Sequence, residues 1–243
     1  MKTKIAVLAC TLLALNIASY ADQTKTDVVE RLQTSATVLR NIELAPDKGI
    51  PDAVIKSAKC VAVVPSMLKG AFIFGGKHGR GVATCRLPHG SWSAPAFFAI
   101  SGGSWGAQVG FEHVQLVMMI MTDQGMRHLM ANKLQIAGTI SAAVGPVGRD
   151  ASAGADWKLD TDMLTYSRSK GLFAGIDLSG SWIERDKDST RAMYGKDYFS
   201  TQIFTGKVPP PSAARAFLTE VRDSVQHSGN ADVASVSSAR RRP

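Results

Sequence analysis

The chain has 243 residues, of which 45% are hydrophobic and 20% are charged, and its formal net charge is +8. No apolar run reaches the length of a membrane-spanning helix, which excludes an integral helical membrane protein. The length allows one large domain or two small ones, and the excess of lysine and arginine favours acidic partners such as an anionic lipid surface.

The first 21 residues have the three parts of a secretory signal peptide. Lys2 and Lys4 form a short basic region, residues 5–17 are mostly apolar, and small residues precede a cleavage site after Ala21. Cys10 allows a second interpretation, a lipoprotein anchor, although the apolar run continues past it. We therefore expect a periplasmic or secreted protein, and association with a membrane is compatible with this location.

Two helices are expected after the signal peptide. Residues 27–42 carry apolar side chains at spacings of three and four, which is typical of an amphipathic helix, and Asp27 with Glu30 resembles a capping box. Residues 51–58 start with Pro51 at a suitable first helical position and predict a short second helix.

The chain between these helices and the C-terminus is dominated by strand signals. Short apolar or β-branched runs alternate with glycine, proline and basic residues, which predicts strands at 60–65, 71–75, 81–86 and 92–100. Further strands are expected at 107–121, 164–169 and 171–185, and helices at 123–132 and within 208–221. Residues 226–243 have the composition of a disordered tail with a basic end.

Two cysteines remain after removal of the signal peptide, Cys60 and Cys85. An even pair in an oxidising compartment favours a disulfide, and the alternative is two buried free thiols. The 24 residues between them would give the disulfide a stabilising effect of about 3 kcal/mol in the chain-entropy model.

Motifs for catalysis, metal binding or nucleotide binding are absent from the sequence. The glycine-rich stretch GPVGRDASAG (145–154) lacks the spacing of a phosphate-binding loop of nucleotide-binding proteins, so its glycines serve either tight turns or a different phosphate. The histidines lack metal-binding spacing, no G-x-S-x-G occurs, and Asp156, Asp160 and Asp162 lack the EF-hand pattern. We therefore expect no enzyme activity, no cofactor or metal, and no nucleic-acid partner.

Basic residues beside glycines are the strongest functional signal. Lys77 and Arg80 lie in GGKHGRG (75–81), where we predict a hairpin tip that exposes both side chains. If further basic and aromatic residues converge with them, they form a surface suited to a lipid phosphate, whereas scattered charges would only aid solubility. The candidate lipid-binding residues are Lys77, Arg80, Arg149, Lys170, Trp105, Lys69 and Arg168.

Four stretches in order resemble the SYLF-domain family. They are AKCVAVVPSMLKGAFIFGGKHGRGVATCR, WSAPAFFAISGGSWGAQVGFE, AVGPVGRDASAG and TYSRSKGLFAGIDLSGSWIERD, and the similarity covers about residues 27–220. The resemblance to this family, in its exported bacterial branch, implies binding of lipids, in particular phosphoinositides, and for some members binding of actin. Eukaryotic relatives have a lysine-rich first helix, whereas the corresponding helix here carries only Arg31 and Arg40.

Together these observations predict an α+β fold, with an antiparallel core sheet flanked by helices in a single SYLF-like domain over 22–225. The expected function is non-catalytic binding of anionic phospholipid or phosphoinositide-like headgroups through basic glycine-rich loops. The alternative is an envelope structural or protein-interaction module that holds a protein partner without lipid specificity.

Overall fold

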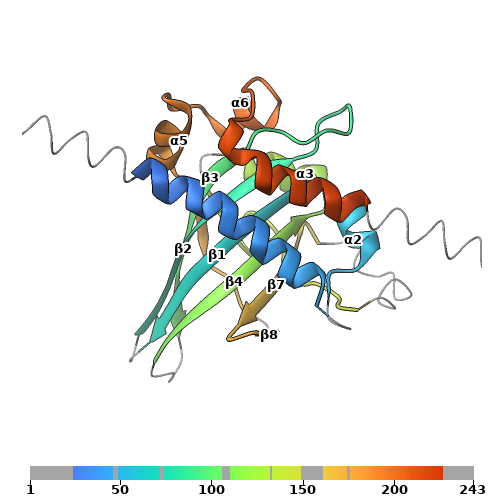
Figure 1. Cartoon of the computed structure of the whole chain (residues 1–243). Helices are drawn as coiled ribbons and strands as arrows, with labels where there is room; N and C mark the ends of the chain where they lie inside the picture. Colours follow the sequence, from blue (N-terminus) through green and yellow to red (C-terminus); the bar gives the residue numbers. More distant parts are fainter. Residues whose placement is uncertain are drawn as a thin grey trace, which may run out of the picture.

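The computed structural model describes residues 24–45, 49–71, 74–105, 110–131, 133–148, 161–173 and 176–226. The predicted signal peptide, with Cys10, lies outside these residues, as do Arg149 and the chain after residue 226. The described residues form an α+β fold, as the sequence predicts (Figure 1).

A large sheet forms the centre of the fold. In the described part of the chain nine strands pair in the order β5-β9-β3-β2-β1-β4-β7-β6, and β8 pairs with β7. The pairs are antiparallel except for β6 and β7, which run parallel at one edge. The strands are β1 (Cys60–Ala71), β2 (Phe74–Cys85), β3 (Ala96–Trp105), β4 (Gly110–Ile120), β5 (Lys133–Gln135), β6 (Ala142–Val144), β7 (Met163–Ser169), β8 (Leu172–Phe173) and β9 (Trp182–Arg185).

The glycine-rich segment 75–81 lies inside β2, so the prediction of a hairpin tip there is wrong. Its glycines permit close packing within the sheet. A Cβ at Gly79 would lie 2.7 Å from Val64 Cγ1, and a Cβ at Gly81 would lie 2.3 Å from the Phe98 ring. Because real Cβ contacts are not this short, these glycines allow β2 to continue where the sequence pattern indicates a turn.

Seven helical segments occur among the described residues. They are 24–43, α2 (Asp52–Ser57), α3 (Asp123–Leu129), α5 (Lys187–Tyr194), α6 (Ser200–Phe204), the 3₁₀ helix η2 (Ser212–Ala214) and 215–226. The helix 24–43 confirms the predicted amphipathic segment, but Asp27 lies inside it and does not cap its start. Residue 226, expected as the first residue of the tail, belongs to the last described helix, and the rest of the predicted tail lies outside the described residues.

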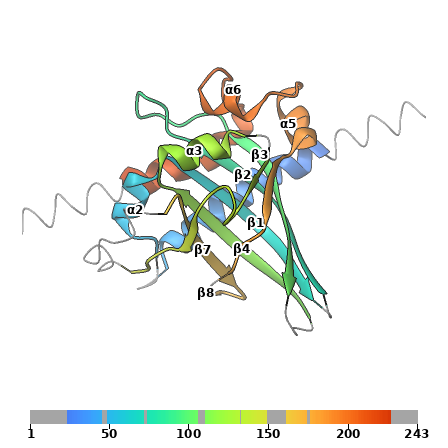
Figure 2. The same cartoon turned by 180° about the vertical axis from the view of Figure 1, so that it is seen from behind.

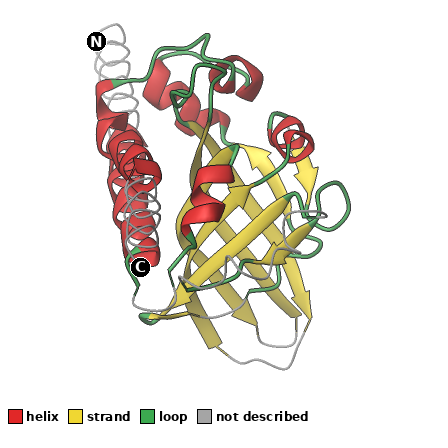
Figure 3. Cartoon of the chain, turned by 90° about the vertical axis from the view of Figure 1, so that its right-hand side faces the viewer, coloured by secondary structure: helices red, strands yellow, loops and turns green. Residues whose placement is uncertain are grey.

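The helices 24–43 and 215–226 lie side by side in one layer against the sheet (Figures 1 and 3). Arg40 forms an ion pair with Glu220, and Ser224 donates a hydrogen bond to Glu43, so polar contacts connect the two helices. Apolar side chains of both helices, including Leu32 and Phe217, pack in one cluster with Val63 and Val117 of the sheet. We call the sheet face under these helices the outer face.

The opposite face, which we call the inner face, carries a second cluster. Met67, Phe98 and Met118 pack there with Leu129 of α3 and Phe204 of α6. Figures 1 and 2 show that the ends of β1 to β4 remote from α3 project beyond the helices. We call this part the distal end of the sheet; it comprises residues 66–71, 74–78, 101–105 and 110–113.

Cys60 and Cys85 face each other on β1 and β2 and form a disulfide, which confirms the predicted pairing. In the described residues, no helix combines the length and the apolar composition needed to cross a membrane.

Candidate functional site

Lys77 and Arg80 point to opposite faces of β2. Side chains alternate along a strand, so residues three apart cannot share a face in regular pairing. Val82, two residues from Arg80, belongs to the outer cluster, so Arg80 points to the outer face. Ala83, six residues from Lys77, belongs to the inner cluster, so Lys77 points to the inner face. The expectation that Lys77 and Arg80 form one exposed basic tip is therefore wrong.

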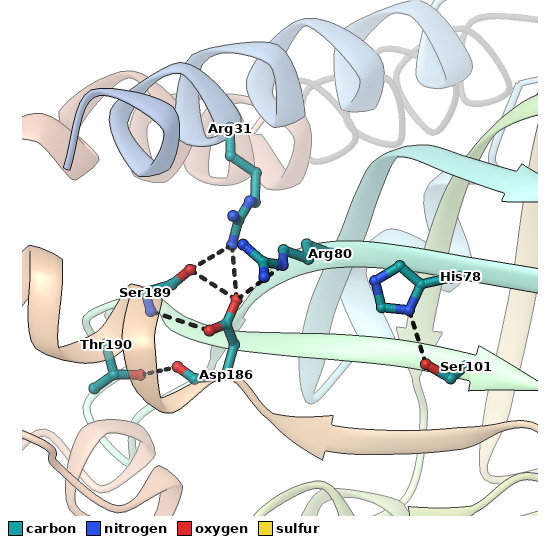
Figure 4. A network of polar contacts seen from close by, with 7 residues as sticks. All are labelled: Arg31, His78, Arg80, Ser101, Asp186, Ser189 and Thr190. Atoms are coloured by element: carbon teal, nitrogen blue, oxygen red, sulfur yellow. Dashed lines mark hydrogen bonds and ion pairs between the residues drawn. The ribbon is translucent and has the colours of Figure 1, made fainter. Parts of the chain in front are cut away.

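Arg80 belongs to a polar network beneath the helix 24–43 (Figure 4). Asp186, at the N-cap of α5, accepts hydrogen bonds from Ser189 N at 3.0 Å and Ser189 Oγ at 2.7 Å. Arg31 Nη1 lies 3.3 Å from Asp186 Oδ2, and Arg80 Nε lies 3.8 Å from the same oxygen. This network joins the helix 24–43, β2 and α5, so the position of Arg80 has a structural explanation.

The charge of Asp186 is maintained despite its burial. Burial acts to raise the pKa of Asp186, but the hydrogen bonds from Ser189 and the charges of Arg31 and Arg80 together hold it below the usual carboxyl value. Burial lowers the pKa of Arg31, and the adjacent Asp186 opposes that effect. The buried carboxylate and guanidinium therefore stabilise each other's charged forms.

Lys77 is a buried lysine on the inner face, with 6% of its surface exposed. Its Nζ donates a hydrogen bond to the backbone oxygen of Asp177 at 2.5 Å. Burial lowers the pKa of Lys77, with a smaller opposing effect from the charge of Asp177. An ammonium has three donors, so this hydrogen bond leaves capacity for a second acceptor.

Lys69 lies directly opposite Lys77 in the β1–β2 ladder. Met67 of the inner cluster precedes Lys69 by two residues, which places Lys69 on the inner face beside Lys77. On its other side Lys69 faces Glu112 of β4, whose carboxylate accepts a hydrogen bond from Ser169 Oγ. The inner face of the distal end thus carries a row of charged and polar groups, with two ammonium groups at neighbouring positions.

Gly102 makes room for the stem of Lys77. It lies opposite Lys77 in the β2–β3 ladder, and a Cβ there would lie 3.0 Å from Lys77 Cε and 2.6 Å from Ser181 Oγ. Asp177, whose backbone oxygen accepts the hydrogen bond from Lys77, is one of the residues that line a groove of about 250 Å³. The lining also includes the apolar residues Ala143, Val144 and Leu178.

The structure places two of the remaining candidate residues outside this row and does not describe the side chains of the other two. Arg168 of β7 donates through Nε to Gly171 O at 2.8 Å, and Lys170 is exposed in the turn before β8 with a positive φ of 47°. Trp105 is the last residue of β3, and its side chain lies outside the described part of the structure, as does all of Arg149.

Exposed apolar side chains near the distal end were not among the residues predicted from the sequence. Phe111 is 83% exposed on β4, Leu172 is 73% exposed on β8, and Leu68 is 41% exposed on β1. An apolar residue in a strand normally indicates a buried position, so composition alone gave no signal here. These side chains are exposed because the strands extend past the helices that cover the outer face, so the lengths of the strands would have been the feature to use.

Comparison with known proteins identifies the family. The family model described as "Las17-binding protein actin regulator", Ysc84, matches residues 101–224. The chain belongs to the Ysc84 family. This membership confirms the resemblance to SYLF domains.

Relatives of this Ysc84-family chain come from fungi and animals. It is 35% identical over 192 residues to "Protein YSC84" of Saccharomyces cerevisiae, covering 76% of this chain and 41% of the yeast protein. It is 36% identical over 170 residues to "SH3 domain-containing YSC84-like protein 1" of Rattus norvegicus, covering 70% of this chain and 50% of the rat protein. The chain thus spans about half the length of these relatives or less.

Within this Ysc84-family chain, the first part of GPVGRDASAG has a packing role. A Cβ at Gly145 would lie 2.2 Å from the Tyr166 ring, and Gly148 has a φ of +90°, where glycine is favoured. Residues 149–154 lie outside the described part, so the phosphate alternative for them stays a prediction.

Proposed function

We propose that this protein is a non-catalytic binder of anionic phospholipid in the cell envelope, with its headgroup contact at the distal end of the sheet. The observation that supports this most directly is the pairing of Lys69 with Lys77 on the inner face. Like charges directly opposite each other destabilise a sheet, so this arrangement favours an anion between the two ammonium groups. A phosphate has the charge and the acceptor oxygens for that position.

The exposed apolar side chains support a membrane over a free phosphate as the source of the anion. An end-on approach of the sheet would bring both Leu172, on the inner face, and Phe111, on the outer face, to the boundary between headgroups and acyl chains, while the exposed Lys170 would remain at the headgroup level. Each basic residue near an anionic leaflet contributes about 1 kcal/mol, so several such contacts give measurable, salt-dependent binding.

Vesicle co-sedimentation tests the proposal. The membranes are vesicles of phosphatidylcholine with or without phosphatidylglycerol, and the variant is Lys69→Gln/Lys170→Gln. We expect about thirtyfold weaker binding to the anionic vesicles, from a loss of about 1 kcal/mol per charge. The matched control is Lys187→Gln/Lys207→Gln, which removes two exposed lysines elsewhere and should bind like the original protein. Equal loss in both variants would show general charge attraction and contradict the proposed site.

A second pair of substitutions tests membrane insertion separately from charge. Phe111→Ser/Leu172→Ser removes two exposed apolar side chains, so folding should be little affected. We expect this variant to bind anionic vesicles more weakly at high salt as well as at low salt, because the lost contact is apolar. Unchanged binding at both salt concentrations would exclude insertion by these residues.

Protein interaction is the second candidate function. The family description names a Las17-binding actin regulator, and one yeast relative is called "LAS seventeen-binding protein 3". The exposed Phe111 would suit a protein partner as well as a lipid. Co-sedimentation with purified actin filaments in the absence of lipid, abolished by Phe111→Ser, would favour this candidate, and filaments that leave the protein in solution would count against it.

A further inference from the structure

A groove of about 310 Å³ lies at the end of the sheet opposite the distal end. Trp92, in its wall, belongs to the connection from the end of β2 to the start of β3, whereas the distal end contains the start of β2 and the end of β3. The other wall is formed by the chain around η2 and by the helix 215–226. The groove is lined by Ser91, Trp92, Pro210, Pro211, Ser212, Arg215, Leu218 and Arg222.

The lining combines an aromatic ring, two prolines and two arginines. Trp92 is 8% exposed, and the guanidinium of Arg86 stacks on its ring at 4.8 Å from the centroid. Arg215 and Arg222 are exposed, and Arg222 Nη2 donates to Thr219 Oγ1 at 3.0 Å, which orients its guanidinium. No carboxylate is among the lining residues in the described structure, so the positive charge of the groove is not balanced from within.

The spacing of the two arginines indicates the form of a ligand. Arg215 and Arg222 are seven residues apart in the helix, about two turns, which places them on one side and about 10 Å apart along the axis. In a polyproline II helix, residues three apart lie on the same side and are separated by about 9 Å. Two carboxylates at that spacing therefore match the two guanidinium groups.

We infer that this groove binds an acidic peptide in the polyproline II conformation, with two carboxylates three residues apart that face Arg215 and Arg222. Apolar walls with an aromatic ring are a common docking surface for this conformation, and here Leu218, Pro210 and Pro211 supply the wall, to which the 8% exposed Trp92 adds a small part. Bidentate guanidinium–carboxylate contacts then fix the register of the peptide. This site is independent of the phospholipid contact proposed for the distal end.

Other occupants fit the charges of the groove less well. The chain after residue 226 contains Asp232 and three consecutive arginines, 240–242, so it would bring net positive charge to an arginine-lined groove. A second copy of this chain has a net charge of +8, which disfavours close association of two copies. A peptide with two carboxylates supplies the complementary charge without this repulsion.

Fluorescence anisotropy of the full chain with a labelled probe tests the inference. The probe is a fluorescein-labelled, proline-rich peptide with two glutamates three residues apart, and its counterpart carries glutamines instead. We expect saturable binding of the acidic probe, weakened about tenfold or more by the glutamine counterpart or by Arg215→Glu/Arg222→Glu. The matched control Arg127→Glu/Lys207→Glu makes the same charge change at exposed cations outside the groove and should retain binding.

Each contrary result overturns the inference. Absence of binding by the original protein excludes the ligand class, and equal weakening in both charge-reversed variants means non-specific attraction. A glutamine peptide that binds as well as the acidic one removes the role of the arginines. If Arg215→Glu/Arg222→Glu instead loses binding to phosphatidylglycerol vesicles or self-association while the probe does not bind, the groove belongs to a membrane or a second copy.

Discussion

Replacing Asp186 with asparagine should destabilise the fold by about 3 kcal/mol. The side chains of Asp186 and Arg31 are 7% and 9% exposed, so the substitution leaves a guanidinium buried without its carboxylate, a change that typically costs about 3–5 kcal/mol. Arg80 adds little, because its side chain is 54% exposed and its Nε is 3.8 Å away. Asparagine keeps an oxygen for Ser189 N, so the N-cap of α5 is retained and the lower end of the range applies.

Urea denaturation of Asp186→Asn at several pH values measures this effect. The pKa of Asp186 in the folded protein lies below the usual carboxyl value, so its contribution is complete above about pH 4 and disappears as the pH falls through the folded pKa. The difference in unfolding free energy between the original protein and the variant should therefore be largest near neutral pH. It should shrink in acid, where the protonated carboxyl of Asp186 is as uncharged as the asparagine that replaces it.

A double-mutant cycle with Arg31→Met separates the ion pair from other effects. Removing both charged groups should cost less than the sum of the single changes, because neither partner then remains buried alone. A loss under about 1 kcal/mol for Asp186→Asn at neutral pH, or additive effects in the cycle, would refute the argument that burial makes this pair important.

Three further substitutions test other parts of the fold. Replacing Cys60 and Cys85 with alanine should lower the free energy of unfolding by about 3 kcal/mol in urea titrations, from the freed 24-residue loop, and an unchanged midpoint would contradict this. Tyr166→Phe should be neutral or stabilise by up to about 1 kcal/mol, because the buried hydroxyl has no hydrogen-bond partner among the described residues; a clear loss of stability would reveal one. Gly145→Ala should lower the melting temperature through a loss of about 1–3 kcal/mol, because its Cβ would clash with the Tyr166 ring, and an unchanged melting temperature would mean that the ring can move.

Local patterns in the sequence predicted the main elements well. The amphipathic helix over 27–42 and the short helix after Pro51 are present, and the Cys60–Cys85 pairing is confirmed. These features depend on residues close together in the chain or on a pair whose one possible competitor, Cys10, lies in the predicted signal peptide. The α+β class followed because helical and strand periodicities occupy separate segments.

Predictions that depended on register or on distant contacts fared less well. Glycines at 75–81 indicated a turn, yet Gly79 and Gly81 admit side chains from across the sheet, which only the three-dimensional packing reveals. The opposite directions of Lys77 and Arg80 follow from strand alternation once the segment is known to be a strand. The pairing of Arg31 with Asp186 spans 155 positions and left no local signal.

The disulfide also closes a covalent ring that contains both lysines of the distal end. A protease that cleaves one peptide bond between residues 60 and 85 would leave the two pieces joined through Cys60 and Cys85. The nicked protein would be one water molecule heavier and would migrate as a single chain until a thiol reductant is added. Accidental cutting of the projecting parts of β1 or β2 would therefore not release either half of the molecule.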